Sequence, residues 1–303
     1  MSFELTILGS NSALPTSNRY PTAQVLQVPG RCFLIDCGEG TQIQLRRNKI
    51  NFSSIQHIFI SHLHGDHYYG LIGLISTMNL MGIKGELHIY AHSELKNLIQ
   101  PLLDQIRGEL TVKPIFHPLN FKKPQTIFES RTVEVISFPV KHSIPTCGFL
   151  FREKQKPANI RKDMIKMYDI PISKMKEIKD GADFECANGT VVPNAELTTP
   201  PSKPSSYAFC TDTAYYPPTA EIIRGVEVLY HESTFLEELK ELAVKTQHST
   251  AKEAAEMAIL SGAKKLLLGH FSARFKKTDR FLEEAKLLFE NTEIAEEGKT
   301  FQI

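Results

Sequence analysis

The order of apolar and polar residues along the chain predicts β-strands and helices that alternate. Residues 3–9 alternate apolar with polar side chains, which is typical of a strand with one buried face. Further strands are expected at 22–28, 32–35, 57–60, 86–91 and 113–118, with helices at 41–48 and around Pro101, which should break or bend the second of them. This alternation favours the α/β class.

The second half of the chain repeats this order without an internal repeat of fixed period. Strands are expected at 131–140, 207–212, 226–231 and 265–270, and helices at 235–245, 250–262 and 278–291. A chain of 303 residues could form one large α/β domain or two small ones, and length does not decide between them.

Between the halves, at residues 152–204, the hydrophobic periodicity weakens and Pro, Lys and Gly accumulate. Residues 152–179 hold nine Lys and Arg against four Asp and Glu, a surplus of +5 in a chain whose formal charge is +1. Such a local concentration predicts an inserted arm that touches phosphates. A merely solvated insertion is the alternative.

Composition limits the setting in which the chain works. The five cysteines are widely spaced and include no Cys-x-x-Cys pair, which favours reduced thiols over a disulfide framework. The amino terminus lacks the pattern of a signal peptide, and no apolar run approaches the length of a membrane span. We therefore expect a cytoplasmic protein with no membrane partner.

The densest group of metal-binding side chains is the loop with His62, His64, Asp66 and His67, directly after the apolar run 57–60. Helical spacing follows the loop, which therefore joins the carboxyl end of a strand to a helix. His62 and His64 can share one face and reach one metal, leaving Asp66 and His67 for a second. An exposed polar turn is the alternative, but burial between two apolar segments would make unsatisfied side chains costly.

Three further side chains capable of binding metal, His142, Asp212 and His270, end apolar strands. Each one alone could be a cap or a core histidine. Together with a loop that needs more ligands, they predict one shared site at one edge of the sheets. Imidazole and carboxylate donors without a thiolate suit Zn²⁺ in a catalytic site, with Mn²⁺ and Fe²⁺ as the other candidates.

Two segments near the amino terminus have open interpretations. Asp36 follows the third predicted strand. It either holds a metal-binding histidine in place without binding the metal itself, or caps the turn that Gly38 and Gly40 allow. The turn-rich segment 10–21 is either a surface loop or a loop that contacts substrate.

Several strings resemble the metallo-β-lactamase superfamily and, within it, the ribonuclease Z family, endonucleases that trim the 3′ trailer from precursor tRNA. The His-x-His-x-Asp-His core at 62–67 is common to the whole superfamily. More specific are Asp-Cys-Gly-Glu-Gly-Thr-Gln at 36–42, His-Glu-Ser-Thr at 231–234, His-Ser-Thr at 248–250 and the arm; the strings 12–16, 212–213 and 270–275 also agree.

The resemblance implies a four-layer αβ/βα sandwich, formed by a single domain over 1–303 into which the arm 152–204 is inserted for tRNA docking. It implies two zinc ions per subunit, a homodimer and a defined ligand set. One zinc would take His62, His64 and His142, the other would take Asp66, His67 and His270, and Asp212 would bridge them.

Charge and the resemblance together suggest how the site acts. Two divalent ions held by two carboxylates keep a net positive charge, which favours an anionic phosphodiester over a neutral ester. Asp66 is expected to ligate metal and to hold a proton of the attacking oxygen. His248, oriented by Glu232, is expected to protonate the leaving ribose oxygen. A helix-capping segment with an exposed imidazole is the alternative for His248.

Substrate contacts are expected from Arg274, which could meet a phosphate with its planar fork, and from Thr16 and Arg19 at the tRNA 3′ end. The arm departs from the family pattern because 170–175 stands where bacterial relatives usually have a glycine-proline motif. Two other functions stay open: a hydrolase of a small phosphodiester or ester with the same fold, and a non-catalytic RNA-binding module with structural zinc.

Overall fold

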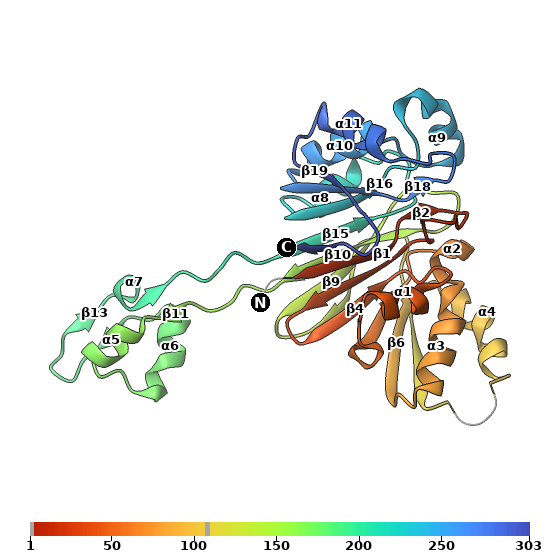
Figure 1. Cartoon of the computed structure of the whole chain (residues 1–303). Coiled ribbons are helices and arrows are strands. Elements are labelled where there is room, and N and C mark those ends of the chain that lie inside the picture. The colour runs from red at the N-terminus through yellow and green to blue at the C-terminus, as the bar shows by residue number, and fades with distance from the viewer. Residues whose placement is uncertain (1–2, 107–109) are drawn as a thin grey trace. The chain divides into compact units, whose positions relative to one another are not determined.

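The computed structural model describes residues 3–106 and 110–303. The chain divides into two compact units, one formed by residues 1–152 and 205–303 and the other by Glu153–Pro204. Figure 1 shows the helices and strands of both units.

The first sheet of the larger unit collects most of the strands expected before residue 120. Its order is β20-β1-β3-β4-β5-β6-β7, with antiparallel pairs from β20 to β4 and parallel pairs from β4 to β7. The strands are β1 (Glu4–Gly9), β3 (Ala23–Val28), β4 (Arg31–Ile35), β5 (Ile55–Phe59), β6 (Gly85–Ala91), β7 (Val112–Pro118) and β20 (Thr300–Gln302).

The second sheet collects strands from the later part of the chain in the order β19-β17-β16-β15-β10-β9-β8. Strands β15, β16, β17 and β19 run parallel, so the carboxyl ends of these strands meet at one edge. The strands are β8 (Gln125–Glu129), β9 (Val133–Pro139), β10 (Cys147–Glu153), β15 (Ser206–Cys210), β16 (Val228–Glu232), β17 (Lys265–Gly269) and β19 (Thr292–Ile294).

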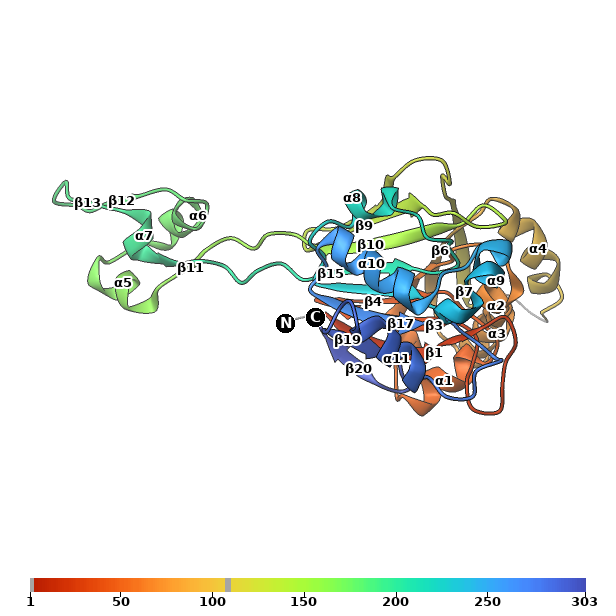
Figure 2. The same cartoon turned by 90° about the horizontal axis from the view of Figure 1, so that it is seen from above.

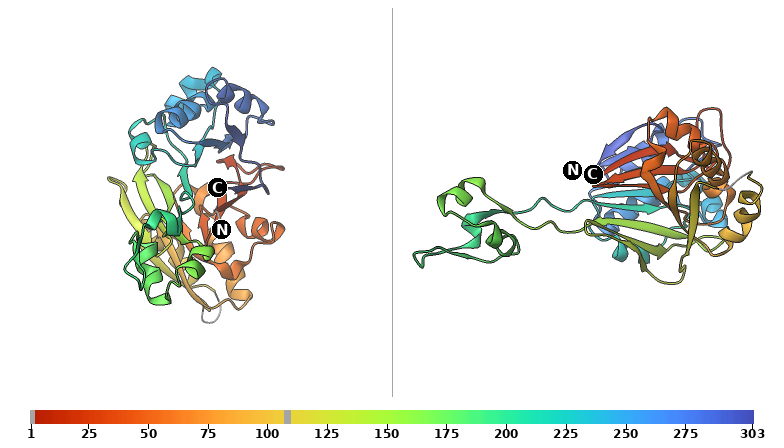
Figure 3. Two further views of the ribbon diagram at one scale, coloured as in Figure 1. Left: turned by 90° about the vertical axis from the view of Figure 1, so that its left-hand side faces the viewer. Right: turned by 90° about the horizontal axis from the view of Figure 1, so that it is seen from below.

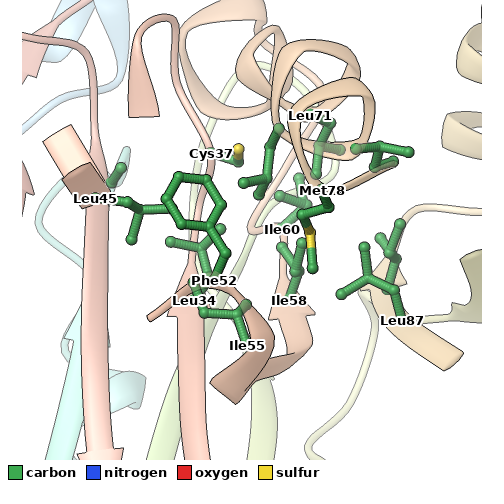
Figure 4. Packing of buried hydrophobic residues seen from close by; sticks show 14 of the residues in the cluster. Leu34, Cys37, Leu45, Phe52, Ile55, Ile58, Ile60, Leu71, Met78 and Leu87 are labelled. Carbon is green, nitrogen blue, oxygen red and sulfur yellow. The ribbon is translucent and has the colours of Figure 1, made fainter. Parts of the chain in front are cut away.

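Helices cover the outer face of each sheet, and three buried clusters separate the layers (Figures 1 and 2; Figure 3, left). The first cluster joins the first sheet to its helices, where Leu45 and Met78 pack on Leu34 and Ile58 (Figure 4). A second, rich in phenylalanine, lies between the sheets, and a third lies under the helices of the second sheet. The helices are α1 (Thr41–Arg47), α3 (Gly70–Leu80), α4 (Glu94–Leu103), α8 (Pro218–Ile222), α10 (Ala251–Ser261) and α11 (Asp279–Lys286).

This layering confirms the predicted α/β sandwich of four layers, αβ/βα, and differs from the sequence-based expectation in detail. The helix expected at 235–245 is a 3₁₀ turn, Glu237–Leu239, followed by α9 (Lys240–Thr246), and α11 ends well before residue 291. Helix α4 is not broken at Pro101, because it continues to Leu103. Strand β10 was not predicted, since a strand buried on both faces shows no alternation.

The smaller unit contains short helices around a small apolar cluster. Ile170, Ile178, Phe184, Val192 and Leu197 are its buried members. Its elements are β11 (Asn159–Ile160), α5 (Lys162–Met167), α6 (Met175–Lys179), β12 (Phe184–Glu185), β13 (Val191–Val192), α7 (Asn194–Leu197) and β14 (Thr198–Thr199). Over residues 3–106 and 110–303, no helix combines the length and the apolar character needed to cross a membrane.

Candidate metal centre and proton donor

The loop that carries His62 and His64 begins where β5 ends. It continues into the single turn of α2 (Gly65–Tyr68), which carries Asp66 and His67. The segment after β4 packs directly against it. A side chain at Gly38 would lie 2.5 Å from the carbonyl oxygen of Asp66, and one at Gly70 would lie 2.1 Å from that of Gly38. Only glycine permits so close an approach, which accounts for Gly38 in the segment after β4 and for Gly70 at the start of α3.

The candidate ligands from the second sheet follow its strands at the shared edge. Asp212 lies two residues beyond β15, and His270 directly follows β17. Their φ angles are 45° and 59°, in the left-handed region that non-glycine residues seldom adopt and that often marks functional positions. His142 follows β9. The structure therefore brings these three side chains to the loop, as the strand-end pattern predicted.

The first group of metal-capable atoms comes from His62, His64, His142 and Asp212. His64 Nδ1 lies 3.0 Å from His62 Nε2 and 3.2 Å from His142 Nε2. Asp212 Oδ2 lies 3.5 Å from His62 Nε2 and 3.7 Å from His142 Nε2. Ligand atoms around a tetrahedral zinc with bonds of about 2.0–2.1 Å are separated by about 3.3 Å, so these separations fit.

The second group comes from Asp66, His67 and His270, and Asp212 faces it as well. Asp212 Oδ1 lies 3.2 Å from His67 Nε2 and 3.0 Å from His270 Nε2, while Asp66 Oδ2 lies 3.3 Å from His67 Nε2. Both Nε2 atoms are buried and have no hydrogen-bond partner within the described residues. Buried nitrogens left unpaired among carboxylate oxygens fit a bound cation.

The ring nitrogens that face away from these groups are held by hydrogen bonds. Asp36 accepts one from His67 Nδ1 at 2.7 Å and two from Ser61, whose hydroxyl also lies 3.0 Å from His62 Nδ1. His142 Nδ1 lies 3.0 Å from the carbonyl oxygen of Gln247. Such partners orient ligand imidazoles and fix their tautomers. Asp36 thus supports a candidate ligand, which was one of its two interpretations.

The pKa values of the buried side chains also fit a bound cation. Burial opposes the charge of His67, yet the carboxylates of Asp212, Asp66 and Asp36 raise its pKa well above the usual histidine value. Burial also disfavours the charge of Asp212, but the imidazoles of His270, His67 and His62 hold its pKa well below the usual range. The surrounding carboxylates thus favour positive charge at this position, where metal binding would compete with protonation of the imidazole.

Beside the two groups, Glu232 and His248 form a hydrogen-bonded pair. His248 Nδ1 lies 2.8 Å from Glu232 Oε1, and its ring centroid lies 5.0 Å from that of His142. Burial disfavours the charged imidazole, but the Glu232 carboxylate raises the pKa of His248 to about 9. Thr250 caps α10, and the His248 side chain is only 14% exposed, contrary to the alternative of an exposed imidazole in a capping segment.

A pocket of about 330 Å³ opens next to this pair. Arg274 and His248 both line it, together with Ser12, Ala13, Leu14, Thr234, Phe235, Thr246, Ser272 and Ala273. The short parallel pair of β2 (Asn11–Ser12) with β18 (Phe271–Ser272) joins its two rims. The backbone N–H of Ala13 also donates to Asp66 Oδ2 at 2.8 Å. The segment 10–21 therefore reaches the site itself.

Thr16 and Arg19 lie outside this pocket. The Arg19 guanidinium donates to the carbonyl oxygens of Phe275 at 2.6 Å and Ser272 at 3.4 Å, and Thr16 Oγ1 accepts from the Arg19 N–H at 3.0 Å. These contacts hold the rim that carries Arg274. No role was predicted for Ser61, Gln247 or Thr234 of the described residues. Their hydrogen bonds to candidate ligand rings produce no characteristic spacing in the sequence.

The sequence of this chain is similar to a family model and to curated proteins. A family model described as anti-Pycsar protein Apyc1 matches residues 3–168. "Ribonuclease Z" of Phocaeicola vulgatus is 46% identical over 97% of this chain and 96% of the relative, and that of Bacteroides thetaiotaomicron is 45% identical over 99% and 95%.

Solved structures give the same assignment. Human tRNase Z, short form, superposes with a TM-score of 0.71 at 25% identity, covering 98% of both chains. The metallo-β-lactamase fold protein YhfI from Bacillus subtilis has a TM-score of 0.70 at 19% identity over all of both chains, which shows the fold alone. The fold and the clustered histidines and aspartates fit a metal cofactor. The chain belongs to the ribonuclease Z family of the metallo-β-lactamase fold.

Proposed function

We propose that this protein is a zinc-dependent endoribonuclease that removes the 3′ trailer from precursor tRNA. The products would be a tRNA with a 3′-hydroxyl and a trailer with a 5′-phosphate. Near-full-length relatives named ribonuclease Z support this function. The observation that carries the chemistry is the position of Asp212, whose two carboxylate oxygens face two groups of histidines beside the Glu232–His248 pair.

The proposed cofactor is two zinc ions per subunit. His62, His64 and His142 would hold one, Asp66, His67 and His270 would hold the other, and Asp212 would contact both. The donors are imidazole and carboxylate in both groups, and the separations suit tetrahedral zinc. When bound, the ions would make water nucleophilic at neutral pH and neutralise charge on the phosphodiester.

The chain's own residues would then manage protons and position the substrate. Besides its place in the second ligand group, the Asp66 carboxylate would hold a proton of the attacking oxygen. His248 would donate a proton to the leaving ribose 3′-oxygen, while Glu232 holds its Nδ1–H and so directs Nε2 toward the substrate. Arg274, exposed on the rim of the same pocket, would bind a phosphate next to the scissile bond.

The role of His248 predicts a loss that depends on the leaving group. His248→Ala should slow tRNA cleavage by about 10²–10⁴-fold, the usual contribution of a general acid. The rate of bis(p-nitrophenyl) phosphate hydrolysis should fall by less than about tenfold, because p-nitrophenolate leaves without needing a proton. Rates of both reactions at saturating zinc would measure the difference.

His92→Ala is the matched control, since His92 lies outside both ligand groups, and it should leave both rates near wild type. Equal losses of the two activities in His248→Ala would contradict the proton-donor role and indicate a role in binding or folding.

Metal removal should abolish activity and destabilise the fold. Binding to the native state alone adds about 4 kcal/mol per site when free zinc is about 1,000-fold above Kd. For a domain of this size, two sites correspond to a fall in Tm on the order of 10–20 °C after chelation. Calorimetry of chelated and zinc-restored protein would test this. A metal-free preparation with unchanged Tm and full cleavage would contradict the proposed centre.

The remaining parts of the proposal concern partners. Residues 152–204 would dock precursor tRNA through their basic side chains, and Ile172, 85% exposed beside Pro171, lies within this segment. We further propose a cytoplasmic homodimer, for which sedimentation of the zinc-loaded protein is the direct test.

A further inference from the structure

The hydroxyl of Thr234 lies between the second ligand group and the proton-donor pair. Its Oγ1 is 2.6 Å from Glu232 Oε2, 3.0 Å from His270 Nδ1 and 3.3 Å from His248 Nδ1. Thr234, Glu232 and His270 are all buried, so water does not replace these contacts. One oxygen atom therefore touches a candidate metal ligand, the candidate acid and the group that orients that acid.

Counting protons assigns the direction of each bond. Glu232 Oε1 accepts from the Thr213 N–H at 2.8 Å, and Oε2 accepts from the Thr234 N–H at 3.1 Å. A buried carboxylate that accepts backbone N–H groups is ionised and has no proton to give. The single hydroxyl proton of Thr234 therefore goes to Glu232 Oε2.

With that proton committed, Oγ1 can only accept from His270. The proton of the neutral His270 ring is then on Nδ1, and Nε2 carries a free lone pair. That nitrogen is the buried atom left without a hydrogen-bond partner among the described residues, and it lies 3.0 Å from Asp212 Oδ1. The tautomer required for metal binding thus follows from the Thr234 hydroxyl.

We propose that Thr234 is a positioning residue that fixes His270 in the metal-binding tautomer and, through the same hydroxyl, holds Glu232 in place for His248. Loading of the second metal group and alignment of the proton donor are therefore linked through one side chain. The link to His248 rests on the proposed function, whereas the link to metal does not.

A purely structural role gives a different expectation. The Thr234 backbone is already fixed, because its N–H donates to Glu232 and its carbonyl oxygen accepts from the Ser272 N–H at 3.2 Å. A threonine that only fills space could be replaced by valine, which has the same shape, with no change in metal affinity. Metal affinity therefore separates the two roles.

The test is zinc titration of metal-free protein against a chromophoric chelator, without RNA. Thr234→Val should weaken one zinc equivalent about 10–100-fold, as expected for loss of an outer partner of a ligand histidine, and leave the other near wild type. Thr234→Ser, which keeps the hydroxyl, should bind both as wild type does.

Thr219→Val is the matched control. Thr219 is a buried threonine of α8 whose hydroxyl has no hydrogen-bond partner within the described residues, so this variant should bind zinc as wild type does. If Thr234→Val bound both zinc equivalents with wild-type affinity, the proposal would be overturned. A loss of about tenfold or more in zinc affinity in Thr234→Ser, relative to wild type, would also overturn it. This result can be obtained even if the valine variant does not fold.

Zinc titration is independent of the substrate. Failure of the wild-type protein to cut tRNA would remove the proposed function and leave the titration result intact. At saturating zinc, Thr234→Val should still lose more tRNA cleavage than bis(p-nitrophenyl) phosphate hydrolysis. Equal losses would leave the metal link standing and remove the link to His248.

Discussion

Replacing Asp212 with asparagine is expected to reduce tRNA cleavage at least about 100-fold, which is more than the usual cost of losing a hydrogen-bond partner of a metal ligand. The change keeps the shape of the side chain but removes the charge that both ligand groups face through Oδ1 and Oδ2. Zinc content after dialysis should fall with activity, and a small phosphodiester should be affected as strongly as tRNA. Elemental analysis together with both rate measurements would show this.

Asp104→Asn provides the matched control, because Asp104 is exposed at the end of α4, where its carboxylate accepts a hydrogen bond from Gln100 Nε2 at 2.8 Å. It should keep full activity and zinc content. If Asp212→Asn retained two zinc ions and wild-type rates, the bridging role would be wrong. If the wild-type protein bound precursor tRNA without cleaving it, the non-catalytic RNA-binding alternative would gain support.

Removal of the arm should separate the two substrate classes. Arg152 of β10 pairs with Ser206 of β15, so an Asn-Gly turn between Glu153 and Ser205 would close a two-residue hairpin in place of 154–204. This variant should lose at least about 100-fold in cleavage of folded precursor tRNA, because the phosphate contacts proposed for the arm would be lost. Hydrolysis of bis(p-nitrophenyl) phosphate should stay within about twofold.

A charge-reversed arm is the control for the deletion. Lys174→Glu with Lys176→Glu keeps the segment and its small apolar cluster but removes local positive charge, and should raise KM for tRNA with little change for the small substrate. Equal loss on both substrates in the deletion would mean that it damaged the larger unit. No loss on either would favour the small-phosphodiester hydrolase.

The candidate ligands could be predicted because each one ends an apolar strand. His142, Asp212 and His270 are far apart in sequence, but parallel neighbours bring the ends of β15, β16 and β17 to one edge, where the loop after β5 also lies. The fold class followed from the same alternation of strands and helices. Family membership rested on longer strings such as 36–42 and 231–234.

What could not be predicted depends on contacts rather than on periodicity. Strand β10 is buried on both faces and so shows no alternation, and the arm's short helices are too brief to show a period. The hydrogen bonds of Ser61, Asp36 and Thr234 to ligand rings appear only once the chain is folded. Arg19 illustrates the same limit, because its guanidinium holds the rim at Phe275.

The most direct test of the central claim is to incubate zinc-loaded protein with a trailer-bearing precursor tRNA and to determine both new ends. We predict a tRNA ending in a 3′-hydroxyl and a trailer beginning with a 5′-phosphate, formed only when zinc is present. An intact precursor, or a product ending in a cyclic phosphate, would contradict a hydrolytic centre in which His248 protonates the ribose 3′-oxygen.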